Sequence, residues 1–365
     1  MNKPVRVAHI IGTMPGGGVK NVVFNYYRNI DRDRYQFDIF YDAKTDIELT
    51  QDLIDMGMRF YRIPNHMKVV DCYKCLREYF KENKYQIVHS HMNTLSFVSL
   101  YAAYKENIPV RIVHNHSVPG GGEYIKHLIK DILRVFSKKY ANTYFACSDK
   151  AANYMYGTTD NVYIMRNAVD YDRFKVINSN RIDELKNKYN LDDKFVIGNV
   201  GRLTYAKNQK FLIDIFKELK KKKDNSKLLF IGDGELKDEL SDYINKLDLN
   251  DDVIITGNVD GVEDYYHLLN IMVLPSVFEG LPLTAIEAQA AHVPLLASDS
   301  TPNEAIISSS GARIIDINSS VDTWIDNIID VSKQEVIFND NSENYIISNC
   351  CNKLMDKYDS ILNMK

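Results

Sequence analysis

The chain has 365 residues, a formal net charge of −4 at neutral pH and a hydrophobic content of 45%. This length exceeds the size at which one hydrophobic core usually keeps growing, so we expect two domains. The slightly acidic balance excludes a protein whose main partner is nucleic acid, because binding to phosphate backbones requires a basic surface.

The sequence predicts neither a signal peptide nor a membrane-spanning helix. A strand-like run begins at Val5 without an apolar signal core before it, and no stretch approaches the roughly 18 consecutive apolar residues that cross a bilayer. The five cysteines, an odd number, fit reduced thiols, and the pair Cys72 and Cys75 lies in a charged helical pattern. We therefore expect a cytoplasmic protein.

Short apolar runs alternate with longer amphipathic ones, which is typical of parallel strands joined by crossover helices. The expected strands of the first half are Val5–Ile11, Phe37–Tyr41, Gln86–His89, Val110–His114 and Thr143–Cys147. Those of the second half are Phe195–Val200, Lys227–Ile231, Val253–Thr256, Ile271–Leu274, Pro294–Ala297 and Ala312–Ile315. The pattern predicts an α/β protein with two doubly wound domains.

The first expected strand is followed by a glycine-rich loop, Gly12–Asn21, that opens a helix. Backbone amides at such a position suit an anion, so the loop is a candidate anion-binding element. It lacks the G-x-G-x-x-G spacing of dinucleotide-binding proteins, which argues against a nicotinamide cofactor.

Two histidine pairs, His89 with His91 and His114 with His116, fall at the ends of two expected strands. Strand alternation puts the members of each pair on one face. Four gathered histidines could bind zinc, but no Asp or Glu accompanies them closely, and we predict no metal site. Taken singly, His89, His91 and His114 are interpreted as core or cleft residues.

A basic stretch, Tyr124–Tyr140, alternates apolar and basic residues at helical spacing. Its apolar face is expected to pack on the sheet. Its basic residues could instead rest on anionic lipid at the inner face of the membrane, so a peripheral membrane contact remains an alternative.

We place the domain boundary after residue 172, between Asn167–Asp170 and the polar stretch Asn178–Leu191. The first domain then covers residues 1–172 and the second covers residues 173–344. A final amphipathic run, Tyr345–Leu362, predicts a helix that closes the chain.

A basic loop, Gly201–Gln209, follows the first expected strand of the second domain. Ligands of open α/β sheets bind at this carboxyl edge. Arg202 and Lys207 are therefore candidates to hold a diphosphate, and the alternative is a solvated basic loop.

Two carboxylates, Glu279 and Glu287, stand eight positions apart around an expected strand-to-helix turn. Gly280 permits a tight turn, and Pro282 stands where a helix would begin. Two acidic residues beside a helix start suit a sugar nucleotide, although such a spacing also occurs by chance in surface helices.

The helix start itself is a candidate phosphate site. Backbone amides around Leu283 and Thr284 would be free of intrahelical partners and would carry the positive end of the helix dipole. We therefore count Gly280, Leu281, Leu283 and Thr284 as candidate donor-binding residues.

Together these motifs resemble the retaining GT-B glycosyltransferases called family 4 or group 1. The matching residues are the E-x7-E pair Glu279 and Glu287, the basic loop with Arg202 and Lys207, the pair His116 and Ser117, and the glycines Gly17 and Gly18. One departure is Lys20, which stands where the family's glycine loop commonly has Glu.

The resemblance implies a GT-B fold, with two Rossmann-like doubly wound domains facing a central cleft. It also implies that residues 345–365 cross back onto the first domain. The first domain would then serve the acceptor, and the second would bind the nucleotide sugar.

The resemblance also implies roles for single residues. Glu279 and His116 would be the catalytic residues beside the transferred sugar, and Glu287 would accept hydrogen bonds from the ribose hydroxyls. Arg202 and Lys207 would hold the donor diphosphate, so no metal or other cofactor would be needed.

The implied function is transfer of a sugar from a UDP-sugar to an acceptor hydroxyl, with retention of the anomeric configuration. The acceptor would be a glycan or a lipid-linked saccharide in the synthesis of a bacterial capsule or exopolysaccharide. Alternatives left open are an epimerase, hydrolase or phosphorylase on the same fold, and a sugar-binding protein without catalytic activity.

Overall fold

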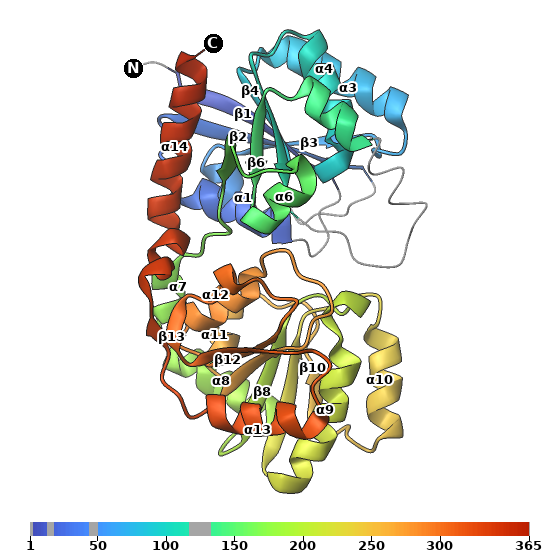
Figure 1. Cartoon of the computed structure of the whole chain (residues 1–365), viewed down its shortest axis with the longest axis vertical. Helices are drawn as coiled ribbons and strands as arrows, with labels where there is room; N and C mark the ends of the chain where they lie inside the picture. Colours follow the sequence, from blue (N-terminus) through green and yellow to red (C-terminus); the bar gives the residue numbers. More distant parts are fainter. Residues whose placement is uncertain (1–2, 13–17, 44–49, 117–132, 365) are drawn as a thin grey trace. The chain divides into compact units, whose positions relative to one another are not determined.

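The chain divides into two compact units, which are described separately below. In the computed structural model, residues 3–12, 18–43, 50–116 and 133–364 are described (Figure 1). Unit 1 comprises Met1–Ala168 with Ile347–Lys365, and unit 2 comprises Val169–Ile346.

Unit 1 is built on a seven-stranded sheet in the order β3-β2-β1-β4-β5-β6-β7, with every neighbouring pair parallel. Its strands are β1 (Val5–Gly12), β2 (Tyr35–Asp42), β3 (Arg59–Ile63), β4 (Ile87–Ser90), β5 (Val110–Asn115), β6 (Thr143–Ala146) and β7 (Val162–Ile164). Its helices include α1 (Gly18–Asn29), α2 (Gln51–Asp55), α3 (Val69–Asn83), the short 3-10 helix η1 (Asn93–Ser96), α4 (Phe97–Lys105), α6 (Asp149–Tyr156) and α14 (Ile347–Asn363).

The two faces of this sheet are covered by different helices. Apolar residues of β1, β2 and β4 pack with α3 and α4 on one face. On the opposite face α14 packs beside α1, where the Cys351 thiol contacts the Tyr26 carbonyl and the Tyr35 hydroxyl donates to Asp359. The final helix is thus part of the core of unit 1.

Unit 2 contains a six-stranded parallel sheet in the order β10-β9-β8-β11-β12-β14, and a separate antiparallel pair, β13 with β15. Its strands are β8 (Phe195–Val200), β9 (Ser226–Ile231), β10 (Val253–Ile255), β11 (Ile271–Leu274), β12 (Leu295–Ser298), β13 (Ser308–Ser310), β14 (Ala312–Ile315) and β15 (Ile337–Phe338). The helices are α7 (Tyr171–Lys175), α8 (Ser179–Tyr189), η2 (Tyr205–Lys207), α9 (Gln209–Lys222), α10 (Lys237–Lys246), α11 (Val262–Tyr266), α12 (Leu283–Ala290), η3 (Asn303–Ala305), α13 (Val321–Val331) and η4 (Asp340–Tyr345).

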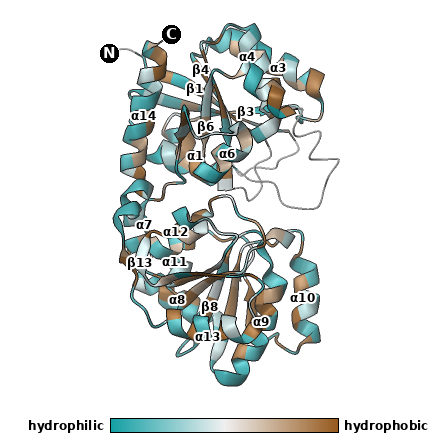
Figure 2. Ribbon diagram, in the orientation of Figure 1, coloured by the Kyte–Doolittle hydropathy of each residue, from teal (hydrophilic) through white to brown (hydrophobic). Residues whose placement is uncertain are grey.

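The core of unit 2 lies between its sheet and the helices α9, α10 and α13. Figure 2 shows hydrophobic residues concentrated in strands such as β8, while α9, α10 and α13 carry both hydrophobic and hydrophilic residues. This is the pattern expected of helices that bury one face and leave the other to water.

The structure departs from the expected elements in two respects. The strands β3, β7, β13 and β15 were not predicted, because they are short or carry polar residues in place of a clear apolar run. A boundary after residue 172 would also divide α7. Val169, the first residue of unit 2, forms a β-bridge with Ile346, the last residue of unit 2, and donates its N–H to the Tyr345 carbonyl at 2.9 Å. The two ends of unit 2 are therefore hydrogen-bonded to each other.

Candidate functional site

The sheet of unit 2 has a topological switch point between β8 and β11. The chain runs from β8 outward to β9 and β10, then returns to β11 on the other side of β8. The loops that follow β8 and β11 therefore lie side by side at the carboxyl edge of the sheet. Ligands of open α/β sheets bind at such switch points.

An ion pair connects these two loops. The Nζ atom of Lys207, at the end of η2, lies 2.6 Å from Oε1 of Glu279, which also accepts a hydrogen bond from the Ser276 hydroxyl at 2.7 Å. The Glu279 side chain is 8% exposed and that of Lys207 is 19% exposed. The backbone N–H of Val277 donates to the Ala206 carbonyl at 2.8 Å, so the two loops are also joined through their backbones.

Two glycines let the loop after β8 approach the loop after β9. A Cβ atom on Gly232 would lie 2.1 Å from the Gly201 carbonyl oxygen, and a Cβ atom on Gly234 would lie 2.3 Å from that of Leu203. Gly232 also has a φ angle of +144°, which disfavours other residues. The Gly232–Gly234 turn therefore supports the backbone of the basic loop.

The structure does not bring Arg202 to the same carboxylate as Lys207. Its guanidinium lies 3.2 Å from Glu235, and both side chains are more than half exposed. The Arg202 carbonyl accepts a hydrogen bond from Gln209 at 3.1 Å, which holds the backbone of the loop while the side chain faces solvent. An exposed pair of this kind contributes little to stability, so Arg202 can exchange its partner for an anion at small cost.

Glu287 lies on α12 and is buried. The Tyr266 hydroxyl donates to its Oε2 atom at 2.8 Å. Burial raises the pKa of Glu287, whereas the Tyr266 hydrogen bond and the nearby charge of Arg173 act in the opposite direction. Arg173 itself forms a two-point ion pair with Glu263, at 3.0 and 2.8 Å.

The start of α12 has no side-chain cap at Pro282. The side chains of Leu281 and Leu283 are buried, and Gly280 is half-buried. Only the backbone of these residues is therefore suited to contact a ligand. The Thr284 hydroxyl is buried and has no hydrogen-bond partner among the described residues.

In unit 1, Gly18 is the first residue of α1 and is exposed, with open space around the position of a Cβ atom. Gly17 lies outside the described residues. Residues 124–132, the first part of the expected basic helix, also lie outside them. Residues 133–140 are helical.

Five histidines, which we call the histidine array, gather at the carboxyl edge of the sheet in unit 1. They are His9, His89, His91, His114 and His116. The first comes from β1, the next two from β4 and the residue after it, and the last two from β5 and the residue after it. His9 and His89 are direct neighbours in the β1–β4 register.

The array is arranged as two hydrogen-bonded rows. In the first row, His91 links His9 at 2.9 Å and His116 at 2.8 Å. In the second row, His89 links His114 at 3.0 Å and the Tyr358 hydroxyl of α14 at 2.8 Å.

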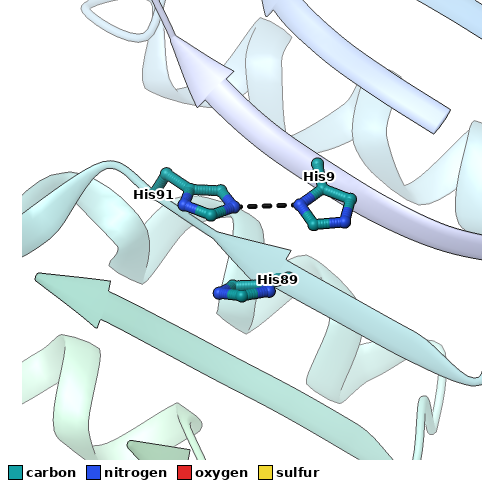
Figure 3. Close-up of side chains that lie close together, drawn as sticks. All are labelled: His9, His89 and His91. Atoms are coloured by element: carbon teal, nitrogen blue, oxygen red, sulfur yellow. Dashed lines mark hydrogen bonds between the residues drawn. The ribbon is translucent and has the colours of Figure 1, made fainter. Parts of the chain in front are cut away.

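The two rows stack on one another. The ring centroids of His89 and His91 are 4.2 Å apart, and those of His114 and His116 are 3.9 Å apart. Figure 3 shows His9 and His91 edge to edge, with His89 below His91.

Burial keeps these imidazoles neutral. It lowers the pKa of His9 and of His116 to about 3. It also lowers the pKa values of His89, His91 and His114 well below the ordinary range, and the neighbouring histidines add to this effect.

Metal binding is the other chemistry that clustered histidines suggest. His9, His89 and His91 offer nitrogens within 4.8 Å of one another, and so do His91, His114 and His116. Zinc requires nitrogen lone pairs that converge on one point about 2.0–2.1 Å from each ligand. The stacked pairs His89 with His91 and His114 with His116 have interplanar angles of 21° and 28°, so their lone pairs lie in separate planes. This array therefore suits hydrogen bonding better than metal coordination.

Sequence reasoning overlooked three residues of these sites: His9, Tyr266 and Ser276. The position of His9, near the carboxyl end of the first strand, was the available signal, because strands β1 and β4 flank the switch point of unit 1. No local pattern marked Tyr266 or Ser276.

Two family profiles match the chain. Residues 181–349 match the family described as "Glycosyl transferases group 1", and residues 16–173 match "Glycosyltransferase Family 4".

Among the helices of the described residues, none combines the length and the hydrophobicity that a membrane-spanning segment requires.

Similar proteins cover nearly the whole chain. The putative glycosyltransferase EpsF of Bacillus subtilis is 26% identical to this chain, and the matched region covers 88% of this chain and 86% of EpsF. The Escherichia coli UDP-Gal:alpha-D-GlcNAc-diphosphoundecaprenol alpha-1,3-galactosyltransferase is 25% identical, covering 98% and 94%. The solved structure of Anabaena HepE in complex with UDP-glucose is 15% identical, with a TM-score of 0.77, covering 97% and 99%.

Proposed function

Because this chain belongs to the group 1 glycosyltransferases of family 4 and has the GT-B fold, we propose that it transfers a sugar from a UDP-sugar to an acceptor hydroxyl with retention of configuration. The acceptor is a lipid-linked saccharide in the synthesis of a surface polysaccharide. The reaction needs no metal ion.

The observation that carries this proposal is the Lys207–Glu279 pair at the switch point of unit 2. Cleavage of a nucleotide sugar leaves a diphosphate with additional negative charge, which a buried cation stabilises strongly. Lys207 supplies that cation, assisted by the exposed guanidinium of Arg202. Glu279 faces the transferred sugar, where a carboxylate stabilises positive charge that develops on the ring.

The helix α12 supplies two further contacts in this proposal. Its uncapped first turn offers backbone N–H groups of Leu283 and Thr284 to the diphosphate, supported by the helix dipole. Glu287 accepts hydrogen bonds from the ribose diol, with the Tyr266 hydroxyl holding its carboxylate in place.

The similar proteins support the choice of substrates. HepE was solved with UDP-glucose, and the Escherichia coli relative is named for transfer of galactose from UDP-Gal to a diphosphoundecaprenol-linked sugar. CapH of Staphylococcus aureus, 23% identical over 93% of this chain, is named for capsular polysaccharide biosynthesis.

The proposed step breaks the bond between the anomeric carbon and the β-phosphate oxygen, and forms a bond from the acceptor oxygen on the same face. The acceptor proton passes to the departing phosphate oxygen, and UDP leaves. His116 donates a hydrogen bond to the donor sugar as the charge moves.

The test is a panel of UDP-glucose, UDP-galactose and UDP-GlcNAc with a diphosphoundecaprenol-linked saccharide as acceptor. We expect UDP release that depends on the acceptor and persists in EDTA, and a product whose anomeric coupling constant matches that of the donor. UDP release without any acceptor would instead identify a hydrolase or epimerase. Binding of a donor without turnover, with every acceptor tried, would favour a sugar-binding protein.

A further inference from the structure

The first row of the histidine array is joined head to tail. His9 Nδ1 meets His91 Nε2, and His91 Nδ1 meets His116 Nε2. Each link therefore pairs the same two kinds of nitrogen in the same order, and both nitrogens of His91 are engaged.

This arrangement allows the row only two states. A neutral imidazole carries one N–H donor and one acceptor nitrogen, so each ring must donate in the same direction as its neighbour. Either all three rings are protonated at Nδ1 and the row donates toward His116, or all three are protonated at Nε2 and it donates toward His9. The tautomer of His116 is thereby tied to those of His91 and His9.

The inner end of the row distinguishes the two states. His9 is fully buried, packs against the Phe37 ring at a centroid distance of 4.1 Å, and has no hydrogen-bond partner at Nε2 among the described residues. Protonation at Nε2 would bury an N–H donor without an acceptor, whereas protonation at Nδ1 leaves only a lone pair there. Orphaned buried N–H groups are the rarer and costlier defect.

We propose that His91, itself held by His9, is a positioning residue that keeps His116 in the Nδ1–H tautomer, so that His116 offers a fixed N–H donor to an oxygen of the donor sugar. This inference rests on the proposed function for the identity of the ligand, but the tautomer is a property of unit 1 alone.

The lack of a hydrogen-bond partner for His9 Nε2 among the described residues also limits proton transfer along the row. A relay of protons along the row would need a proton source at this nitrogen, and the described residues place no hydrogen-bond partner there. The row therefore orients a hydrogen bond and does not conduct protons, so His116 acts as a neutral donor rather than as a general acid.

The first test is ring ¹⁵N NMR of the full chain labelled at histidine, because nitrogen shifts distinguish protonated from unprotonated ring positions. We expect His9, His91 and His116 all to be protonated at Nδ1. In His91→Leu, which removes both links, the His116 signals should shift toward a mixture of tautomers. His116 protonated at Nε2 in the parent protein would overturn the proposal.

Two variants sharpen this measurement. In His91→Asn the carboxamide N–H can take the place of Nδ1–H and donate to His116, so the Nδ1–H signature should return. His89→Asn is the matched control, because it makes the same change at a buried histidine of the second row and should leave the His116 tautomer unaltered. Should His91→Leu fail to fold, His9→Leu removes the anchor of the row and is expected to mix the tautomers of His116.

Turnover gives the second readout. We expect kcat of His91→Leu to fall about tenfold, with a smaller change in the donor KM, and to recover in His91→Asn. An unchanged kcat and an unchanged His116 tautomer in His91→Leu would refute the role of His91. Stoichiometric Co²⁺ binding that is lost in His91→Leu would refute it as well, because the same nitrogens would then converge on an ion. If the parent protein shows the tautomers expected but transfers no sugar, the proposed function fails and the positioning role of His91 stands.

Discussion

The ammonium group of Lys207 lies 2.6 Å from the carboxylate of Glu279, across the junction of β8 and β11. The two residues come from separate loops, and each neutralises the other in a largely buried position. In the proposed function, a bound diphosphate would add negative charge beside Lys207. The Lys207 ammonium would then interact with both the diphosphate and the Glu279 carboxylate.

Removing only the cation should therefore be costly. In Lys207→Met, Glu279 remains mostly buried without its partner, and we expect the free energy of unfolding to fall by about 3 kcal/mol. Turnover should fall by a factor of about 10² or more, because the leaving diphosphate loses its stabilising charge. Denaturant unfolding and UDP release measure the two effects.

The double variant Lys207→Met with Glu279→Gln separates stability from catalysis. It has no unpaired buried charge, so most of the lost stability should return while turnover stays low. A double variant no more stable than Lys207→Met would show that the pair does not couple the two loops.

Glu287 should make the stability of unit 2 depend on pH. Its pKa is raised mainly by burial, so between the ordinary glutamate pKa and the raised value the folded state binds more protons than the unfolded state. The stability contributed by this group is therefore present at acidic pH and is lost as pH rises through that interval. Glu287→Gln should gain stability relative to the parent as pH rises above the ordinary glutamate pKa and through the raised pKa of Glu287.

The same variant should bind the donor at least about tenfold more weakly, because a neutral amide is a poorer acceptor for the ribose diol. Unfolding at several pH values and titration calorimetry with a UDP-sugar check the two effects. A stability difference between Glu287→Gln and the parent that does not vary with pH would contradict the burial argument.

Gly232 is expected to tolerate no side chain. In Gly232→Ala the new Cβ atom would meet the Gly201 carbonyl oxygen at 2.1 Å, so the two loops would have to separate. Gly157→Ala is a matched control, since Gly157 also has a positive φ angle, +78°, but no atom lies within 4 Å of its Cβ position. We expect a loss of about 1 kcal/mol for the control and roughly 3 kcal/mol or more for Gly232→Ala, measured by denaturant unfolding.

The histidine array should make unit 1 sensitive to acid. Burial lowers the pKa values of all five imidazoles, to about 3 for His9 and His116, so the unfolded chain binds more protons below the ordinary histidine pKa. Stability is therefore present above about pH 6.5 and is lost as pH falls. For each histidine that stays neutral in the fold, the free energy of unfolding falls by about 1.4 kcal/mol for each unit by which the pH drops below the ordinary histidine pKa.

Hydrogen exchange at decreasing pH tests this expectation. Amides of β1, β4 and β5 should lose protection between about pH 6.5 and pH 5, before those of β8 and β11 in unit 2. Retained protection of β1, β4 and β5 down to pH 5 would mean that the array is protonated without unfolding, and equal loss in the two sheets would mean that acid does not act selectively on unit 1.

Much of the fold could be predicted because its pattern is local. The strands β8 and β11 were placed at their observed bounds by short apolar runs between amphipathic segments. The strand β3 escaped prediction because its residues, Arg59–Ile63, are mostly polar or only partly buried, and it is held by pairing with β2 rather than by an apolar run. Strand pairing of this kind joins distant residues and leaves little trace in a short window of sequence.

The candidate site divides in the same way. The sequence by itself determined which residue types stand at the carboxyl ends of strands, because strand ends and turns follow from local alternation and from glycine and proline. Only the tertiary structure decided their partners: Lys207 with Glu279, Glu287 with Tyr266, and His116 with His91 and His9. Such partners are set by strand order and register, which bring residues together across tens of positions that no local pattern connects.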